Sequence, residues 1–307
     1  MNIIKYIKHP FSFFKDLKVR RLNGKYGQAL SDEEYLKKMF KVKTGKELNL
    51  DDPQCYTEKL QWLKLYNHNP EYTVMVDKYR AKEYVAEKIG EEYIIPTLGV
   101  WDKFEDIDFD VLPDQFVLKC THDSGGRIIC RDKNQLNLQQ SKQKINASLA
   151  RDYYLSGREW PYKDVPRKII AEKYMKEDSV EGSEECLTDY KWFCFDGEPK
   201  LVYISKDNAS NPRTDFFDMD FNHVNMRMKD KNSEVLPKKP KLFDEMKRLA
   251  TILSAGIPHI RVDFYNINGK VYFGELTFFH NSGFSRIYPE EWDYKLGEWI
   301  ELPRVEK

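Results

Sequence analysis

Apolar residues recur at helical spacing through the first third of the chain. Residues 31–90 are predicted to be mainly helical, because runs such as 57–63 and 78–89 place apolar side chains three or four positions apart. Ser31 precedes three acidic residues, with Glu34 three positions after it, which is typical of a helix that begins with a capping box. We therefore expect a helical N-terminal region.

The pattern changes near residue 93 to short apolar runs separated by turn residues. The predicted strands cover residues 93–101, 115–120, 127–130, 168–175, 189–195, 199–205, 260–266 and 270–276. Further helices are predicted at 134–155 and 240–255. Two pairs of strands form hairpins, around Asp196-Gly197-Glu198 and around Asn268-Gly269. Hairpins mixed with helices predict an α+β fold rather than the regular alternation of a parallel doubly wound sheet.

The N-terminal 27 residues are basic and amphipathic. The apolar residues that could share one helix face are Ile3, Ile4, Ile7, Phe11, Phe14 and Leu17, and Pro10 would break or kink that helix. The cations are Lys5, Lys8, Lys15, Lys18, Arg20, Arg21 and Lys25, against the single acid Asp16. Two interpretations stay open: the segment contacts an anionic membrane surface, or it packs as an ordinary helix on the rest of the protein.

Composition narrows the class of protein. The 307 residues are 41% hydrophobic, which is enough to bury a core, and the 50 lysines and arginines equal the 50 acids. This balance gives no reason to expect nucleic acid as a partner. The five cysteines show neither zinc spacing nor a disulfide framework, which indicates a reducing, cytoplasmic setting. No stretch approaches the roughly 20 apolar residues of a membrane helix, and the N-terminus lacks the features of a signal peptide.

The first candidate for chemistry is Lys119, at the end of a predicted buried strand. It is followed by a loop with Ser124, Gly125 and Gly126 before the return strand. Glycines allow backbone N–H groups to approach a phosphate, and a lysine supplies a compensating charge. The order of residues is not that of a Walker loop. An ordinary hairpin explains the same pattern.

The second candidate is an acidic pair in the last predicted hairpin. Arg261, Asp263 and Tyr265 share one strand face, and the hairpin can bring Asp263 beside Glu275. Two carboxylates in the middle of a sheet need a cationic partner. Magnesium would serve, and so would a salt bridge to Arg261.

The third candidate is the apolar run Ile169-Ile170-Ala171, which ends in Glu172 and Lys173 and leads into a polar connector. Such a segment suits a hinge whose backbone edge pairs with a purine. A plain structural strand is the alternative.

Taken in order, these three candidate sites resemble the ATP-grasp fold. The amino-acid sequences of several segments resemble those of its TupA-like family. The segments are TEKLQWLKLY, DKYRAKEYV, IPTLGVWD, QFVLKCTHDSGGRIIC, REWPYKDV, IIAEKYM, DYKWFCFDGEPK, HIRVDFYNINGKVYFGELTF and SGF. The resemblance runs from about Asp51 to about Leu302. It implies an ATP-grasp fold of two α+β subdomains that clasp ATP, preceded by a helical region.

The resemblance also implies roles for matching residues. For the nucleotide, the implied residues are the phosphate lysines Lys78 and Lys119, the lid residues Ser124, Gly125 and Gly126, the hinge residues Glu172, Lys173 and Met175, and Asp189 at the γ-phosphate. Backbone atoms of Lys173 and Met175 would pair with adenine. The implied catalytic residues are Lys191 and Arg261, and the implied magnesium ligands are Asp263, Glu275 and Thr277.

Some positions depart from the family pattern. Thr277 stands where an asparagine ligand is usual, His280-Asn281 precedes Ser-Gly where Pro-Gly is usual, and Asp123 stands at a glycine position of the loop. The implied organisation is a basic segment at 1–30, a helical region at 31–92, an ATP-grasp subdomain with the lid at 93–175, and a C-terminal subdomain with the metal site at 176–307.

The function that the resemblance implies is that of an ATP-dependent carboxylate–amine ligase. It would work through an acylphosphate and join an amine donor to a sugar-acid or peptide acceptor of a bacterial surface polysaccharide, with ATP and Mg²⁺, in the cytoplasm or at the inner membrane face. One alternative is a glycosyltransferase of the same pathway, although Asp218-Met219-Asp220 is better interpreted as a turn than as a metal motif. The other is a kinase-like or non-catalytic ATP-binding protein.

Overall fold

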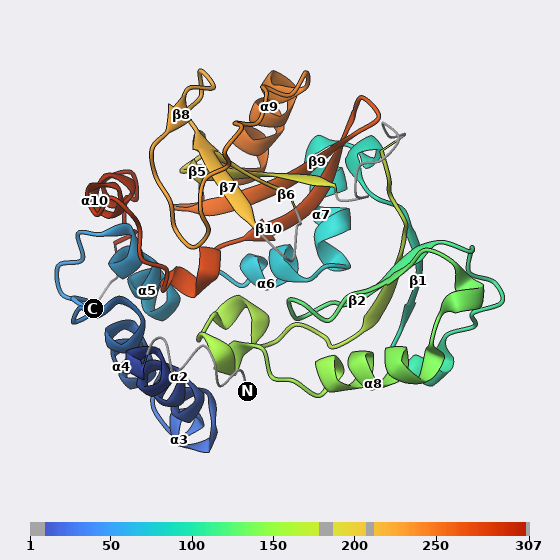
Figure 1. Cartoon of the computed structure of the whole chain (residues 1–307), viewed down its shortest axis with the longest axis horizontal. Coiled ribbons are helices and arrows are strands. Elements are labelled where there is room, and N and C mark those ends of the chain that lie inside the picture. Colours follow the sequence, from blue (N-terminus) through green and yellow to red (C-terminus); the bar gives the residue numbers. More distant parts are fainter. Residues whose placement is uncertain (1–9, 178–186, 207–211, 305–307) are drawn as a thin grey trace.

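The computed structural model describes residues 10–177, 187–206 and 212–304, and two antiparallel sheets dominate it (Figure 1). The larger sheet has the order β10 (Lys270–Thr277), β9 (Ile260–Ile267), β5 (Thr188–Phe195), β6 (Glu198–Lys206), β7 (Arg213–Phe217) and β8 (His223–Val224). The smaller has the order β1 (Thr97–Trp101), β4 (Ile169–Lys173), β2 (Phe116–Cys120) and β3 (Ile128–Cys130). Antiparallel sheets with separate helices confirm the predicted α+β class.

The helices lie mainly in the first third of the chain, as the spacing of apolar residues predicts. They are α2 (Pro10–Asn23), α3 (Lys25–Gln28), α4 (Asp32–Thr44), α5 (Tyr56–Tyr66), α6 (Glu71–Val76), α7 (Arg80–Ile89), α8 (Leu138–Leu149), α9 (Phe243–Ser254) and α10 (Glu291–Glu298). Short 3-10 turns occupy Glu91–Tyr93, Phe104–Asp106, Lys133–Gln135, Tyr154–Ser156, Trp160–Tyr162 and His280–Gly283. The capping box predicted at Ser31 is present, with its hydroxyl bonded to the N–H of Glu34.

Each sheet packs one face against a helix, and the other face contributes side chains to the cavity between the sheets. Helix α9 covers the larger sheet, where Trp192 of β5 packs on Phe243 with ring centroids 4.9 Å apart. Helix α8 covers the smaller sheet, where Ile145 joins Phe116 and Leu118 in a separate core. Strand side chains alternate between faces, so Lys119 points away from that core.

The N-terminal helices form a third core of their own, which also includes Phe284 from the C-terminal end. In α2 the buried Leu22 joins this core, whereas Phe14 and Leu17 remain 61% and 53% exposed. The described part of α2 begins at Pro10, so the predicted break or kink there depends on residues outside the described range and stays a prediction. Ile3, Ile4 and Ile7 lie outside the described residues. The C-terminal end of this basic segment therefore packs on the protein, and contact of the segment with a membrane stays a prediction.

Several elements differ from the sequence prediction. A strand was predicted over residues 93–101, but β1 begins only at Thr97 because Pro96 has no N–H to donate to a sheet. The carbonyl of Pro96 accepts a hydrogen bond from the N–H of Lys173 at the end of β4. Strands β7 and β8 and helix α10 were not predicted at all. In the part of the chain that the structure describes, no helix has the length and apolar character needed to cross a bilayer.

His259 links the N-terminal helices to the larger sheet and predicts sensitivity to acid. Its Nδ1 lies 2.9 Å from the carbonyl oxygen of Cys194 and its Nε2 lies 3.0 Å from the hydroxyl of Tyr56. Burial lowers the pKa of His259 to about 3. The neutral ring therefore donates to the carbonyl and accepts from the tyrosine.

Because the folded-state pKa is depressed, the unfolded chain binds a proton at His259 that the folded chain does not, between pH 6.5 and about 3. We expect the free energy of unfolding to fall by about 2 kcal/mol between pH 6.5 and 5. Urea unfolding at both pH values measures this, and H259Q should flatten the dependence. An equal pH dependence in wild type and H259Q would contradict the assignment.

Candidate functional site

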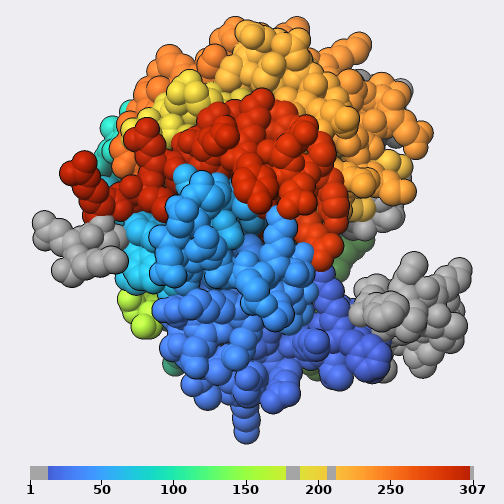
Figure 2. Space-filling model, turned by 90° about the vertical axis from the view of Figure 1, so that its left-hand side faces the viewer, coloured from blue at the N-terminus to red at the C-terminus, as the bar shows by residue number. Residues whose placement is uncertain are grey.

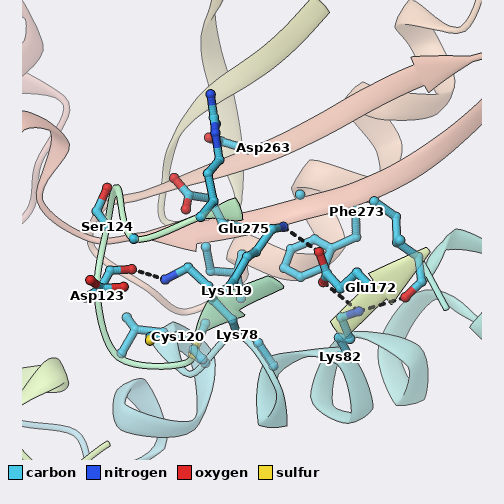
Figure 3. Close-up of a pocket in the computed structure, with 18 of the residues that line it drawn as sticks. Lys78, Lys82, Lys119, Cys120, Asp123, Ser124, Glu172, Asp263, Phe273 and Glu275 are labelled. Atoms are coloured by element: carbon cyan, nitrogen blue, oxygen red, sulfur yellow. Dashed lines mark hydrogen bonds and ion pairs between the residues drawn. The ribbon is translucent and has the colours of Figure 1, made fainter. Parts of the chain in front are cut away.

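A cavity of about 240 Å³ lies between the two sheets, and Figure 3 shows its charged lining. Its charged residues are Lys78, Lys82, Lys119, Asp123, Arg127, Glu172, Asp189, Lys191, Asp263 and Glu275. Its loop residues include Ser124, Gly125 and Gly126. Most of the site residues predicted from the sequence thus line one space, although they come from β2, β4, β5, β9, β10, the glycine loop and the segment before α7. The predicted residues outside this lining are Lys173, Met175, Arg261 and Thr277.

Glu172 balances two lysines on the floor of this cavity. Its carboxylate lies 2.5 Å from Nζ of Lys119 and 2.7 Å from Nζ of Lys82. Burial would raise the pKa of Glu172, but Lys119 and Lys82 outweigh burial and lower it. The carboxylate is therefore ionised and holds both ammonium groups at the cavity. The adenine-hinge role that the resemblance implies for Glu172 stays a prediction.

Lys78 is tied to the glycine loop from the opposite side. Its backbone N–H donates to the carbonyl of Thr121, and its Nζ donates to the carbonyl of Asp123. The carboxylate of Asp123 is buried and accepts from the hydroxyl of Ser148 in α8. Gly125 has a φ of +95°, a backbone conformation that favours glycine. These bonds fix the loop over the cavity.

Gly126 leaves no room for a side chain, and this gives a testable prediction. A Cβ atom there would overlap Oγ of Ser148 and lie 3.0 Å from the carboxylate of Asp123. The substitution G126A should push the loop off α8 and weaken ATP binding about 10-fold, measured by calorimetry. S148A alone is the control, and G126A/S148A should recover part of the loss. Unchanged binding by G126A would contradict a role for this loop.

A row of charges crosses the larger sheet above the cavity. Lys191 of β5 pairs in register with Asp263 of β9, which pairs with Glu275 of β10. A bulge at Gly274 produces the last pairing, because regular pairing would place Glu275 opposite Val262. Burial would raise the pKa of Glu275, but Arg261, Lys78 and Lys191 lower it to about 2. The predicted proximity of Asp263 and Glu275 is confirmed.

Arg261 neutralises this acidic pair. Its Nε and Nη2 lie 2.7 Å from the two oxygens of Asp263, and Nη2 lies 2.6 Å from Glu275. The salt bridge considered from the sequence is thus formed. Thr277 donates to Glu275 and accepts from Arg261, both at 3.1 Å. Neither Arg261 nor Thr277 lines the cavity, which differs from the expectation that Thr277 is a third metal ligand and Arg261 contacts the phosphoryl group.

His280 lies behind Arg261. Its Nδ1 is 2.6 Å from Nη1 of Arg261. A guanidinium can only donate, so Nδ1 accepts and the proton of the neutral ring lies on Nε2. Burial lowers the pKa of His280 well below its usual value, and Arg261 adds to this effect. The side-chain Nδ2 of Asn281 lies 2.9 Å from Nε2. Since a protonated Nε2 needs an acceptor, the two groups form a hydrogen bond only when the amide of Asn281 turns its oxygen toward the ring.

A second cavity, of about 150 Å³, adjoins the first and shares Lys119, Glu172, Asp189 and Tyr265 with it. It is lined by Lys173 and Met175 and by apolar residues such as Val117 and Ile129. The N–H of Lys173 donates to Pro96 within the sheet. The carbonyl of Lys173 is therefore the backbone group left for the predicted hydrogen bond with adenine.

The structure adds one lysine that sequence reasoning missed. Lys82 lies in the first turn of α7, four positions after Lys78, and it is held by Glu172 and by the carbonyl of Ile95 at 2.7 Å. The spacing of four residues within the helix predicted for 78–89 was the available signal. Elsewhere, Asp218 accepts from the N–H groups of Asp220 and Asn222, which confirms the turn predicted for that motif.

A comparison with family models decides which family this arrangement represents. The model of the TupA-like ATPgrasp family matches residues 58–301. The chain belongs to this family. The fold that positions the two cavities is therefore the ATP-grasp fold. A search of curated protein sequences found no match.

Solved structures similar to this TupA-like chain include three ligases and synthetases. They are D-alanine–D-alanine ligase from Helicobacter pylori (13% identity, TM-score 0.41, covering 80% of this chain and 69% of that one), N5-carboxyaminoimidazole ribonucleotide synthetase from Thermus thermophilus (12%, 0.40, 72% and 51%), and D-alanine–D-alanine ligase from Bacillus anthracis complexed with ATP (17%, 0.36, 66% and 53%). The chain spans about half the length of the last two.

Proposed function

We propose that this protein is an ATP-dependent carboxylate–amine ligase that acts through an acylphosphate. The observation that carries the proposal is the pair of adjoining cavities. One is charged and contains Lys78, Lys82 and Lys119, and the other is partly apolar and runs along the end of β4. A nucleotide has the same two parts, a polyanionic phosphate chain and a flat, weakly polar base.

In this arrangement the triphosphate occupies the larger cavity. Lys78 and Lys119 approach it from two sides, and the glycine loop supplies N–H groups. Phosphate oxygens of the bound nucleotide would replace part of the ion pairing that Lys119 and Lys82 have with Glu172. Adenine then lies against the hinge residues Lys173 and Met175, with Asp189 between the two regions.

The acidic pair fits magnesium. Across the part of the chain that the structure describes, no three acidic, histidine or cysteine side chains gather closely enough to form a metal cage. Magnesium in nucleotide sites needs only one or two carboxylates, because phosphates and water complete its shell. Asp263 and Glu275 line the cavity, and both contact the same nitrogen of Arg261, so their oxygens converge. Bound there, magnesium would neutralise charge on the β- and γ-phosphates.

The chain's own residues then position the reaction. A carboxylate oxygen of the acceptor forms a bond to the γ-phosphorus as the bond from that phosphorus to the bridging oxygen of ADP breaks. The amine nitrogen next attacks the acyl carbon, inorganic phosphate leaves, and the nitrogen loses a proton. Lys191, held by Asp189 at 2.6 Å, offsets charge on the transferring group. No protein nucleophile is required.

For the biological setting we propose an acceptor from a bacterial surface polysaccharide, of the capsule, O-antigen or teichuronopeptide type, and an amino acid or other amine as donor. Membership of the TupA-like family supports this choice. The reaction would take place in the cytoplasm or at the inner membrane face.

The test uses the purified full chain with magnesium and ATP, a panel of uronic acids and acidic peptides, and a panel of amino acids. We expect ADP and phosphate only when an acid and an amine are both present. Hydroxylamine should replace the amine and trap the acylphosphate as a hydroxamate. E275Q is the inactive control. Release of AMP and pyrophosphate would contradict the mechanism.

A further inference from the structure

Helix α2 packs on the protein with one side and exposes apolar residues on another. Leu22 is buried in the core of the N-terminal helices, and Val19 packs against the same core. Phe14 and Leu17 lie three positions apart on the solvent side of the helix, and they are 61% and 53% exposed. The ring of Phe13, which is also exposed, has its centroid 5.7 Å from that of Phe14. We call the three side chains Phe13, Phe14 and Leu17 the α2 patch.

Cations border the α2 patch. Lys18 and Arg21 each lie four positions after an apolar residue of the patch, so they share its side of the helix, and both are exposed. The guanidinium carbon of Arg21 lies 4.3 Å from the ring centroid of Tyr26, an exposed aromatic residue of α3. The single acid of α2, Asp16, lies two positions from Lys18 and therefore on a different side. The solvent side of α2 thus combines apolar and positively charged side chains.

The acids of the neighbouring helix do not neutralise this charge. Glu33, in the first turn of α4, pairs with Lys37 at 2.6 Å. Asp32 pairs with the buried Arg158 at 3.2 Å. Among the residues that the structure describes, no carboxylate forms an ion pair with either of the two cations that border the α2 patch. Because the whole chain has equal numbers of acidic and basic residues, the positive charge of this side of α2 is a local feature.

The α2 patch is remote from the nucleotide cavities. Figure 1 places the N-terminal helices at the opposite end of the molecule from α9, and Figure 2 shows the same arrangement, with blue below and orange above. Of the described residues that line either cavity, none precedes Met75 in the sequence. A partner at the α2 patch therefore does not compete with a nucleotide for the same residues.

From this placement we propose that the α2 patch binds the surface of a bilayer that contains anionic phospholipid. The apolar side chains enter the boundary between headgroups and acyl chains, and Lys18 and Arg21 pair with headgroup phosphates. A second copy of the chain fits this surface less well, because pairing two such patches would bring their cations together. The proposal goes beyond the ligase function and is independent of it, since it uses no residue of either cavity.

The experiment measures flotation of the full chain with vesicles of phosphatidylcholine alone, or of phosphatidylcholine and phosphatidylglycerol in equal parts. The first test variant is F14S/L17S. Its matched control is V235S/L236S, which replaces two apolar residues, 87% and 44% exposed, in the loop between β8 and α9. The second test variant is K18Q/R21Q. Its matched control is K241Q/R248Q, which removes one exposed lysine before α9 and one exposed arginine within it.

We expect the wild type to float with vesicles that contain phosphatidylglycerol and not with phosphatidylcholine alone, and binding should weaken as salt is raised. F14S/L17S and K18Q/R21Q should each weaken binding at least about 10-fold, because one loses the inserted side chains and the other the attraction to anionic headgroups. Both control variants should bind like wild type. Equal binding of F14S/L17S and wild type would overturn the proposal, and so would equal binding of the wild type to both kinds of vesicle.

Two further measurements separate this proposal from its rivals. Sedimentation equilibrium without lipid tests for pairing of two copies, and a dimer that F14S/L17S dissociates, together with no flotation, would overturn membrane binding. ADP release should be equal in wild type and F14S/L17S when the acid and the amine are soluble, because the patch is remote from both cavities. Flotation that depends on the patch supports the proposal even if no acid and amine release ADP, and failure to float leaves the ligase function unaffected.

Discussion

Replacing Lys119 with methionine should reduce ATP-dependent ADP release at least about 100-fold. The methionine keeps most of the side-chain volume but removes the charge that would face the proposed triphosphate, and a preorganised charge of this kind contributes about two to three orders of magnitude to turnover. It also leaves Glu172 with Lys82 as its remaining cation, so the cavity becomes more negative. Binding of ATP should weaken together with turnover.

The matched control for K119M is K168M. Lys168 adjoins the same sheet and is also ion-paired, 2.7 Å from Asp102, but it is half-buried and does not line either cavity. We expect K168M to keep wild-type turnover, measured by a coupled ADP assay. Equal activity of K119M and K168M would show that the triphosphate does not lie at Lys119.

The second large effect is expected for D263N, which should lose both turnover and stability. Asp263 is buried and forms a two-point contact with Arg261 and a further contact with Lys191 at 3.4 Å. Removal of its charge leaves buried cations poorly paired, which costs about 3 kcal/mol. It also removes one of the two proposed magnesium ligands. Turnover should fall at least about 100-fold.

The variant E275Q separates these two effects. The side chain of Glu275 is 45% exposed, and Arg261 keeps Asp263 when Glu275 loses its charge. We therefore expect E275Q to lose turnover like D263N but to unfold at nearly the wild-type urea concentration. If E275Q turned over ATP normally while D263N unfolded early, the acidic pair would be a structural salt bridge with no metal function.

Local signals made much of the site predictable from sequence. The strand–turn–strand pattern around Asn268-Gly269 placed Asp263 beside Glu275, and Lys119 emerged from the alternation of β2. The bulge at Gly274 was not predicted, although an isolated glycine within a strand is a signal for one. It determines which residue lies opposite Asp263.

Features that depend on contacts between distant segments could not be predicted. Glu172 was interpreted as part of the hinge, and only the fold shows that it lies between Lys119 and Lys82. The same holds for Lys64, whose buried ammonium group meets Ser282 across 218 positions of sequence. One cavity is lined by Lys15 of α2, Lys43 of α4 and Arg286 near the C-terminal end, and no spacing rule connects these parts of the sequence.

We infer that ATP and magnesium bind together between the two sheets. The most direct test is a calorimetric titration of wild type and E275Q with ATP, each with and without magnesium. The structure predicts that magnesium strengthens ATP binding at least about 10-fold in wild type and that E275Q loses most of this gain. Equal affinity of wild type for ATP with and without magnesium, or an unchanged gain in E275Q, would contradict it.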